Sequence, residues 1–286
     1  MDLMKAVWKV FWRSLLVAIG YVTGLILAGM IGAMLGAQMA SSTRNSSTFA
    51  WLLIASILLG VILGPLASHL TLTRLQHFIL WGSLIFFNLG SVAIEGAYFA
   101  PELVTIPLPV LFAQQLLASA GAALAIVLLF SSIGKPAISW ADALRVRPWY
   151  SWLWRFVVSS ISYLLFYFFF GALNYSLVTA PYYEAHAGGL NVPAQMVVLM
   201  AESIRAPLIV LSVLFHLLSA RGTKRQLMLK TGWLLFAIGG IVPLVLQIGS
   251  LPLLLLAASA VEIFLQNFLT GVVAAGLMGI EEKSSA

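Results

Sequence analysis

The sequence predicts an all-α, polytopic membrane protein with about eight transmembrane helices. Of its 286 residues, 62% are hydrophobic and only 8% are charged, and the mean hydropathy is +1.03. Soluble domains carry about 25% charged residues. The chain contains eight apolar runs that are long enough to cross a bilayer as helices. No stretch between these runs is polar enough to form a sizeable soluble domain.

The expected spans are separated by short polar or basic loops. They cover residues 14–39, 49–70, 77–97, 108–131, 151–177, 196–218, 231–248 and 253–279. A basic amphipathic lead-in, residues 1–13, precedes the first span. In the longest basic loop, Ser139 and Asp142 have the spacing of a helix cap, which predicts a short helix lying in the membrane interface. Pro65, Pro207 and Pro243 are expected to bend their spans.

Small residues recur at every fourth position of the first span. They are Gly20, Gly24, Ala28, Gly32 and Gly36. Such a ridge lets a second helix approach closely, so it predicts a packing surface.

The basic residues predict the orientation of the chain. With eight spans both termini lie on one side, and 13 of the 15 Lys and Arg residues fall on that side, whereas Arg44 lies on the other and Arg205 lies inside a span. Because cytoplasmic loops carry the excess of Lys and Arg, we expect both termini in the cytoplasm and the protein in the cytoplasmic (inner) membrane. The formal charge of +6 therefore indicates orientation and not binding to nucleic acid.

Similar short motifs recur about half a chain apart. At an offset of 142, Trp12-Arg13 matches Trp154-Arg155, Tyr21 matches Tyr163, and Pro65-Leu66 matches Pro207-Leu208; Gly82 matches Gly232 at an offset of 150. These matches predict a four-span repeat at residues 1–135, a linker with the interfacial helix at 136–150, and a second four-span repeat at 151–286. Because four spans preserve orientation, the halves would be parallel, as in one class of transporters.

The sixth span carries Glu202 and Arg205, three residues apart and therefore on one helical face. Ionisable groups are expensive within a membrane, so they face protein or water and usually mark a working site. We expect Arg205 to lie between Glu202 and Glu262 of the eighth span. Two carboxylates and one guanidinium would leave one carboxylate to bind a proton or a cation.

Further polar residues inside the spans complete the candidate ion- or solute-binding site. They are Asn88, His216 and Gln266. No catalytic residue and no metal ligand is predicted, because the chain lacks cysteine and contains none of the common metal-binding or nucleophile motifs. The sequence indicates no particular cofactor.

These observations favour a transporter or carrier of a small solute, coupled to a proton or a cation. Two alternatives stay open. One is a non-catalytic membrane subunit, sensor or assembly factor, for which the glycine ridge could supply contacts to another subunit or to a second copy of the chain. The other is a membrane-embedded, lipid-modifying enzyme, which the absence of a nucleophile–base pair disfavours. In each case the lipid bilayer is the common partner.

Overall fold

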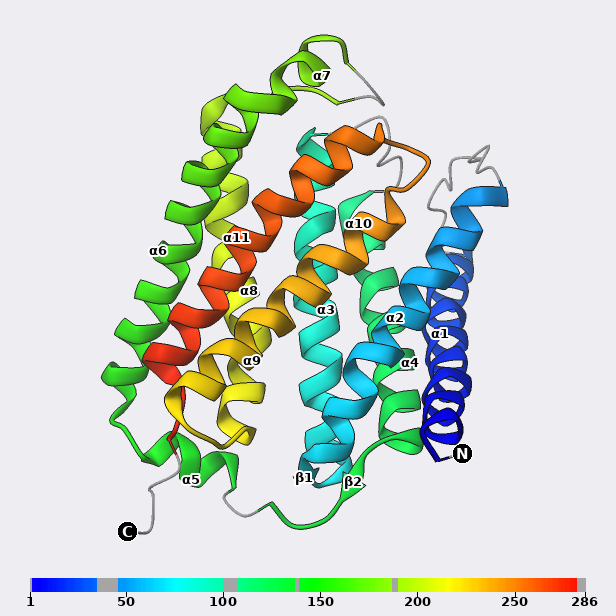
Figure 1. The fold of residues 1–286 in the computed structure, drawn as a ribbon, viewed down its shortest axis with the longest axis vertical. Coiled ribbons are helices and arrows are strands. Elements are labelled where there is room, and N and C mark those ends of the chain that lie inside the picture. Colours follow the sequence, from blue (N-terminus) through cyan, green and yellow to red (C-terminus); the bar gives the residue numbers. More distant parts are fainter. Residues whose placement is uncertain (1, 35–45, 100–106, 137–138, 187–189, 282–286) are drawn as a thin grey trace.

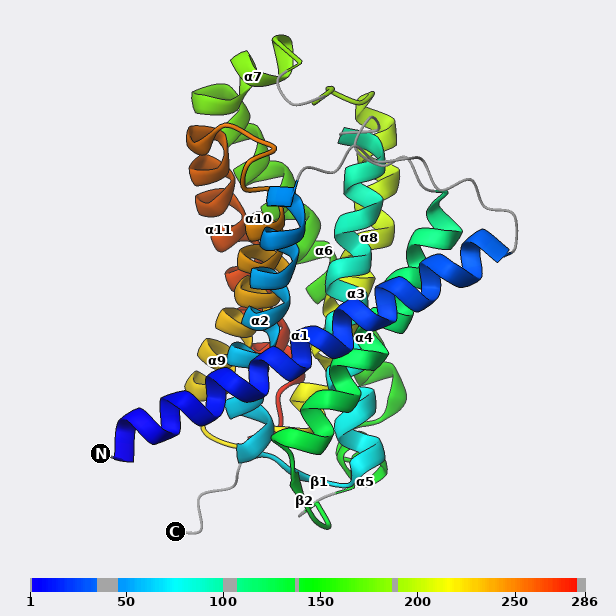
Figure 2. The same cartoon turned by 90° about the vertical axis from the view of Figure 1, so that its right-hand side faces the viewer.

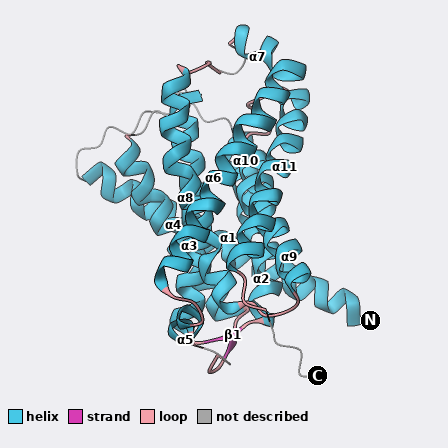
Figure 3. Cartoon of the chain, turned by 90° about the vertical axis from the view of Figure 1, so that its left-hand side faces the viewer, coloured by secondary structure: helices cyan, strands magenta, loops and turns pink. Residues whose placement is uncertain are grey.

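The computed structural model describes residues 2–34, 46–99, 107–136, 139–186 and 190–281. These residues are nearly all helical, and Figure 3 shows a helical bundle with short loops and a short strand pair at one end. Among the described residues, eight helical segments are long and apolar enough to cross a membrane. The predicted multi-pass helical class is therefore confirmed.

The first half of the chain supplies four long helices. They are α1 (Asp2–Met34), α2 (Ser46–His69), α3 (Arg74–Phe99) and α4 (Leu108–Leu129). In this half, α4 packs against α1, α3 and α2, and α1 also packs against α2. Figure 2 shows α1 crossing the other helices of the bundle diagonally.

The second half of the chain is divided into more and shorter helical segments. The connecting helix is α5 (Trp140–Arg145), followed by α6 (Trp149–Asn174), η1 (Tyr175–Thr179), α7 (Ala180–Glu184), α8 (Gln195–Ser219), α9 (Lys224–Phe236), η3 (Ala237–Ile241), α10 (Val242–Leu246) and α11 (Leu253–Met278). Here α11 packs against α6, α9 and α8, and α6 also packs against α8. The two halves meet where α3 packs on α8 and where α2 packs on α10 (Figure 1).

The helix bounds differ from the sequence prediction at two basic segments. The helix α1 begins at Asp2, so the lead-in and the first span form one continuous helix, while the predicted end at residue 39 lies outside the described residues. The helix α9 begins at Lys224 and not at residue 231, because Thr223 and Gln226 form a capping box before the apolar residues start. Hydropathy marks the apolar core of a span, whereas the caps determine where its helix begins.

The all-α prediction misses one small element. The strands β1 (Thr71–Leu72) and β2 (Ser132–Ile133) pair in parallel, joining the segments that follow α2 and α4. By contrast, the predicted short helix after the fourth span is present as α5. Its Ser139 side chain accepts a hydrogen bond from the backbone N–H of Asp142, as the capping pattern predicts.

Among the described residues of the second half, two turns of π-helix occur, and each lies just before a proline. η1 ends at Thr179 before Pro181, and η3 ends at Ile241 before Pro243. Proline cannot donate a helical hydrogen bond, and its ring crowds the carbonyl four residues earlier. A wider π turn relieves this crowding, and π turns are frequent at functional sites.

The glycine ridge of α1 packs directly against the backbone of α4. A Cβ atom at Gly20 would lie 2.6 Å from the Gly121 carbonyl oxygen, and one at Gly24 would collide with the Leu117 carbonyl group. Backbone atoms cannot move aside as a flexible side chain can. The sequence prediction of a close helix–helix contact is confirmed at these two positions.

Candidate functional site

A buried ion-pair network connects α3 to α8. The Arg205 guanidinium donates through Nη1 to Glu202 Oε1 at 2.5 Å, and its Nη2 lies 2.7 Å from Glu95 Oε2. Glu202 and Arg205 are three residues apart on α8, whereas Glu95 comes from α3 in the other half of the chain. We call Glu95, Glu202 and Arg205 the charged triad.

The three members of the triad differ in exposure. The Glu202 side chain is fully buried and that of Arg205 is 6% exposed, whereas 33% of the Glu95 side chain is exposed. At a rise of about 1.5 Å per residue, Arg205 lies roughly 15 Å from the first residue of α8. Glu95 is therefore the most exposed member of the triad.

Two tyrosines of α6 complete the surroundings of the triad. The Tyr163 hydroxyl donates to Glu202 Oε2 at 3.2 Å, and the Arg205 guanidinium carbon lies 6.0 Å from the centre of the Tyr167 ring. Both tyrosines are buried. Glu202 thus has one partner for each carboxylate oxygen, as a buried carboxylate requires.

Glu262 is not the second partner of Arg205, which corrects the prediction from the sequence. Its Oε2 accepts a hydrogen bond from Asn174 Nδ2 at 2.5 Å, between α11 and α6. A Cβ atom at Gly171 would lie 3.2 Å from Glu262 Oε1, so a glycine one turn before Asn174 leaves room for the carboxylate. Glu262 therefore belongs to a separate polar contact between α11 and α6, and its partner Asn174 is the last residue before the π turn η1.

Asn88 also lies apart from the triad. Its Nδ2 donates to Ser212 Oγ at 2.8 Å, between α3 and α8. Asn88 lies seven residues before Glu95, and Ser212 lies seven residues after Arg205, so the two α3–α8 contacts are two helical turns, about 10 Å, apart. A Cβ atom at Gly239 of η3 would lie 2.7 Å from Asn88 Oδ1, so this glycine is required where the π turn passes Asn88.

The remaining two predicted site residues are buried at other places. Gln266 lies on α11, where its backbone carbonyl accepts a hydrogen bond from the Thr270 hydroxyl at 2.7 Å. His216 lies on α8, eleven residues after Arg205, and neither of its ring nitrogens has a hydrogen-bond partner among the described residues. Of the six predicted residues, the structure brings only Glu202 and Arg205 together.

The electrostatics of the triad favour binding of a proton or a cation. With all three groups ionised, two carboxylates and one guanidinium carry a net charge of −1. The Nε–H of Arg205 is buried and has no partner among the described residues, so it remains a donor for an acceptor atom. The triad could therefore hold a cationic group or a proton beside its two carboxylates and an acceptor atom at Arg205.

The comparisons with known proteins and the search for metal sites give no further assignment. No family model, no curated protein and no solved structure matches the chain. Within the described ranges, no group of three or more His, Cys, Asp or Glu side chains is placed to hold a metal ion.

Replacing Tyr163 with phenylalanine is expected to destabilise the protein by about 1–2 kcal/mol, since it removes a hydrogen bond to a buried carboxylate. Thermal unfolding of the purified protein in lipid nanodiscs measures this. Tyr167→Phe is the matched control, because its ring lies beside Arg205 while its hydroxyl has no hydrogen bond to the described residues. Equal losses in the two variants would show that the Glu202 contact contributes nothing.

Proposed function

We propose that the protein is an integral membrane transporter of a small solute, coupled to a proton or a cation, with the charged triad as its binding site. The observation that carries this proposal is the position of Arg205 between carboxylates from both halves of the chain, one of them partly exposed. In several transporter folds, substrate and coupling ions bind where two halves of the fold meet. A buried, incompletely neutralised charge in a membrane protein is also a functional-site hypothesis by default.

The packing pattern supports the proposal that the two halves are a parallel repeat. Exchanging α1 with α6, α2 with α8, α3 with α9–η3–α10, and α4 with α11 reproduces the main helix contacts. For example, α1–α4 corresponds to α6–α11, and α3–α8 corresponds to α10–α2. An experimental structure tests this. The halves should superpose by rotation about the membrane normal, and an axis within the membrane plane would contradict the proposal.

The distribution of basic residues supports a cytoplasmic position for both termini. Because the native chain has no cysteine, a single Lys5→Cys variant gives a clean labelling site. A membrane-impermeant maleimide should label it in inside-out vesicles and not in right-side-out vesicles. Labelling from the outside would reverse the proposed orientation.

Transport is tested by a solute-uptake screen in proteoliposomes under an imposed proton or cation gradient. We expect Glu95→Gln to reduce uptake about tenfold or more, because it removes one charged contact of roughly 1.5 kcal/mol at the entrance of the site. Glu184→Gln makes the same change at an exposed position of α7 and should leave uptake unchanged. Uptake that is equal in the native protein and Glu95→Gln for every transported solute would overturn the assignment of the site.

A second candidate function is a non-catalytic membrane subunit, in which the triad only holds α3 to α8. The burial of both Glu202 and Arg205 favours this alternative. The two candidates differ in what happens when the whole buried pair is replaced by apolar side chains. A purely structural pair can be replaced without loss of function, whereas a binding site cannot.

A further inference from the structure

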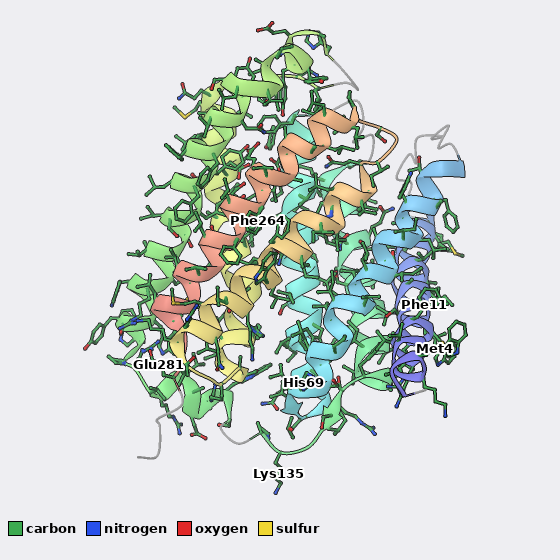
Figure 4. The ribbon with its side chains drawn as sticks, in the orientation of Figure 1. Met4, Phe11, His69, Lys135, Phe264 and Glu281 are labelled. Atoms are coloured by element: carbon green, nitrogen blue, oxygen red, sulfur yellow. The ribbon has the colours of Figure 1, made fainter. Side chains whose placement is uncertain are left out.

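A second candidate site lies at the end of the bundle that carries the first turns of α6 and α9 and the last turn of α11. A cavity of about 360 Å³ opens there between these three helices. Its lining includes the three basic residues Arg147, Arg155 and Lys224 and one acidic residue, Glu281. Figure 4 places Glu281 beside the first turns of α6 and α9, about the full length of the bundle away from α7.

Two of these basic side chains are held in place by the end of α11. Arg147 donates to the carbonyl oxygens of Met278 and Gly279 at 2.9 and 2.8 Å, and Arg155 donates to the carbonyl oxygen of Leu277. A helix C-terminus is the negative end of the helix dipole and has free carbonyl groups, so it orients cations. The two guanidinium groups are thus preorganised at one wall of the cavity.

The positive charge of the cavity is only partly neutralised. Among the described residues, no carboxylate lies within ion-pair distance of Arg147, Arg155 or Lys224. Three cations and one carboxylate line the cavity, which leaves an excess charge of +2. Burial, and then the neighbouring charge of Arg155, lower the pKa of Arg147. A bound anion would relieve this repulsion.

The surroundings of the cavity resemble a membrane interface. Trp149, Tyr150 and Trp154, on the first turns of α6, are 75%, 61% and 46% exposed. Aromatic side chains of this kind sit at the level of the lipid headgroups. Further along α6, the exposed side chains are apolar, among them Ile161 and Leu165. An acyl chain could lie along this face while its headgroup occupies the cavity.

We infer that this cavity binds the phosphate group of an anionic phospholipid. Basic pockets between transmembrane helices at the interface bind such headgroups, and the guanidinium fork suits phosphate oxygens. Basic residues in the cytoplasmic loops would be enough to set the orientation of the protein in the membrane, and for this they would not need to line a cavity. The fixed guanidinium groups, the excess charge and the exposed apolar side chains further along α6 together favour a lipid over a soluble phosphate.

Lys224→Gln and Arg225→Gln provide a matched test. Both remove one exposed cation from the same turn of α9, but only Lys224 lines the cavity, and neither side chain caps α11. Native mass spectrometry of the purified full chain, titrated with phosphatidylglycerol, measures lipid retention. We expect Lys224→Gln to weaken retention about fivefold and Arg225→Gln to leave it unchanged, with phosphatidylcholine not retained.

Three outcomes would overturn the inference. Equal retention of phosphatidylcholine and phosphatidylglycerol, or equal losses in the two variants, would show that the cavity does not recognise the phosphate charge. Binding of inorganic phosphate is measured separately. If Lys224→Gln weakens the binding of millimolar phosphate but leaves the retention of phosphatidylglycerol unchanged, the cavity takes a soluble phosphate and the lipid assignment is wrong.

Discussion

Replacing Arg205 with methionine destabilises the protein by about 3–5 kcal/mol, since it leaves the fully buried Glu202 carboxylate without a counter-charge. Glu95 is partly exposed and can be hydrated in place, so the expected cost arises mainly at Glu202. Thermal unfolding in nanodiscs measures the change. Arg145→Met is the control, because the Arg145 and Asp142 side chains are 82% and 62% exposed and such pairs contribute little.

Adding Glu202→Leu to Arg205→Met is expected to restore most of the lost stability. A buried ion pair can be replaced by apolar side chains of similar volume at little cost, whereas removing one partner is expensive. A double variant that is as unstable as Arg205→Met would mean that the loss comes from packing around Arg205 and not from the unpaired carboxylate.

The second large effect is expected at the contact between α1 and α4. Gly24→Ala places a Cβ atom against the Leu117 carbonyl group and 2.6 Å from the Ala118 Cα, so the two helices must separate. We expect a loss of about 1–3 kcal/mol, the usual cost of overpacking.

Gly82→Ala is the matched control for this change. A Cβ atom there would lie 3.6 Å from the Ala123 Cβ, an ordinary contact, and alanine is the better helix former by about 1 kcal/mol. In the same thermal unfolding measurement, Gly24→Ala should therefore lower the stability of the protein and Gly82→Ala should raise it. Equal stability of the two variants would contradict the close α1–α4 contact.

Much of the fold follows from local properties of the sequence. Runs of apolar residues long enough to cross a bilayer identify all eight helical segments. A chain that crosses the bilayer core must satisfy its backbone hydrogen bonds internally, so such a run is expected to be helical. The residue at which a helix begins is harder to predict from hydropathy. The helix α9 is an example, because its capping box lies within a basic segment that hydropathy assigns to a loop. The β1–β2 pair joins segments about 60 residues apart, and two-residue strands have no periodicity that a sequence could reveal.

The contacts of the candidate site also differ in how far the sequence predicts them. The pairing of Arg205 with Glu202 is local, so a spacing of three residues on one helix predicts it. The pairing with Glu95 depends on the register of α3 against α8, which no local pattern determines. Helical spacing does not reveal which polar faces of two helices meet. For this reason the sequence predicts Glu262, and not Glu95, as the second partner of Arg205.

The π turns have a weak signal in the sequence. Each lies just before a proline, but Pro181 follows the predicted span 151–177, whereas Pro243 lies inside the predicted span 231–248. Pro65 and Pro207 lie inside the regular helices α2 and α8, so proline alone does not predict a π turn. Gly171, which leaves room for the Glu262 side chain, lies four residues before η1, and Gly239, which packs against the Asn88 side chain, lies inside η3. These polar contacts therefore depend on tertiary packing that the sequence leaves open.

Uptake by the double variant Arg205→Met, Glu202→Leu tests the central proposal most directly. The variant is expected to keep the fold, so its uptake in proteoliposomes can be compared with that of the native protein without a loss of stability. If the triad is a binding site, uptake of every solute carried by the native protein falls to the level of empty liposomes. Native uptake by a stably folded double variant would contradict the proposal and leave the triad as a structural link between α3 and α8.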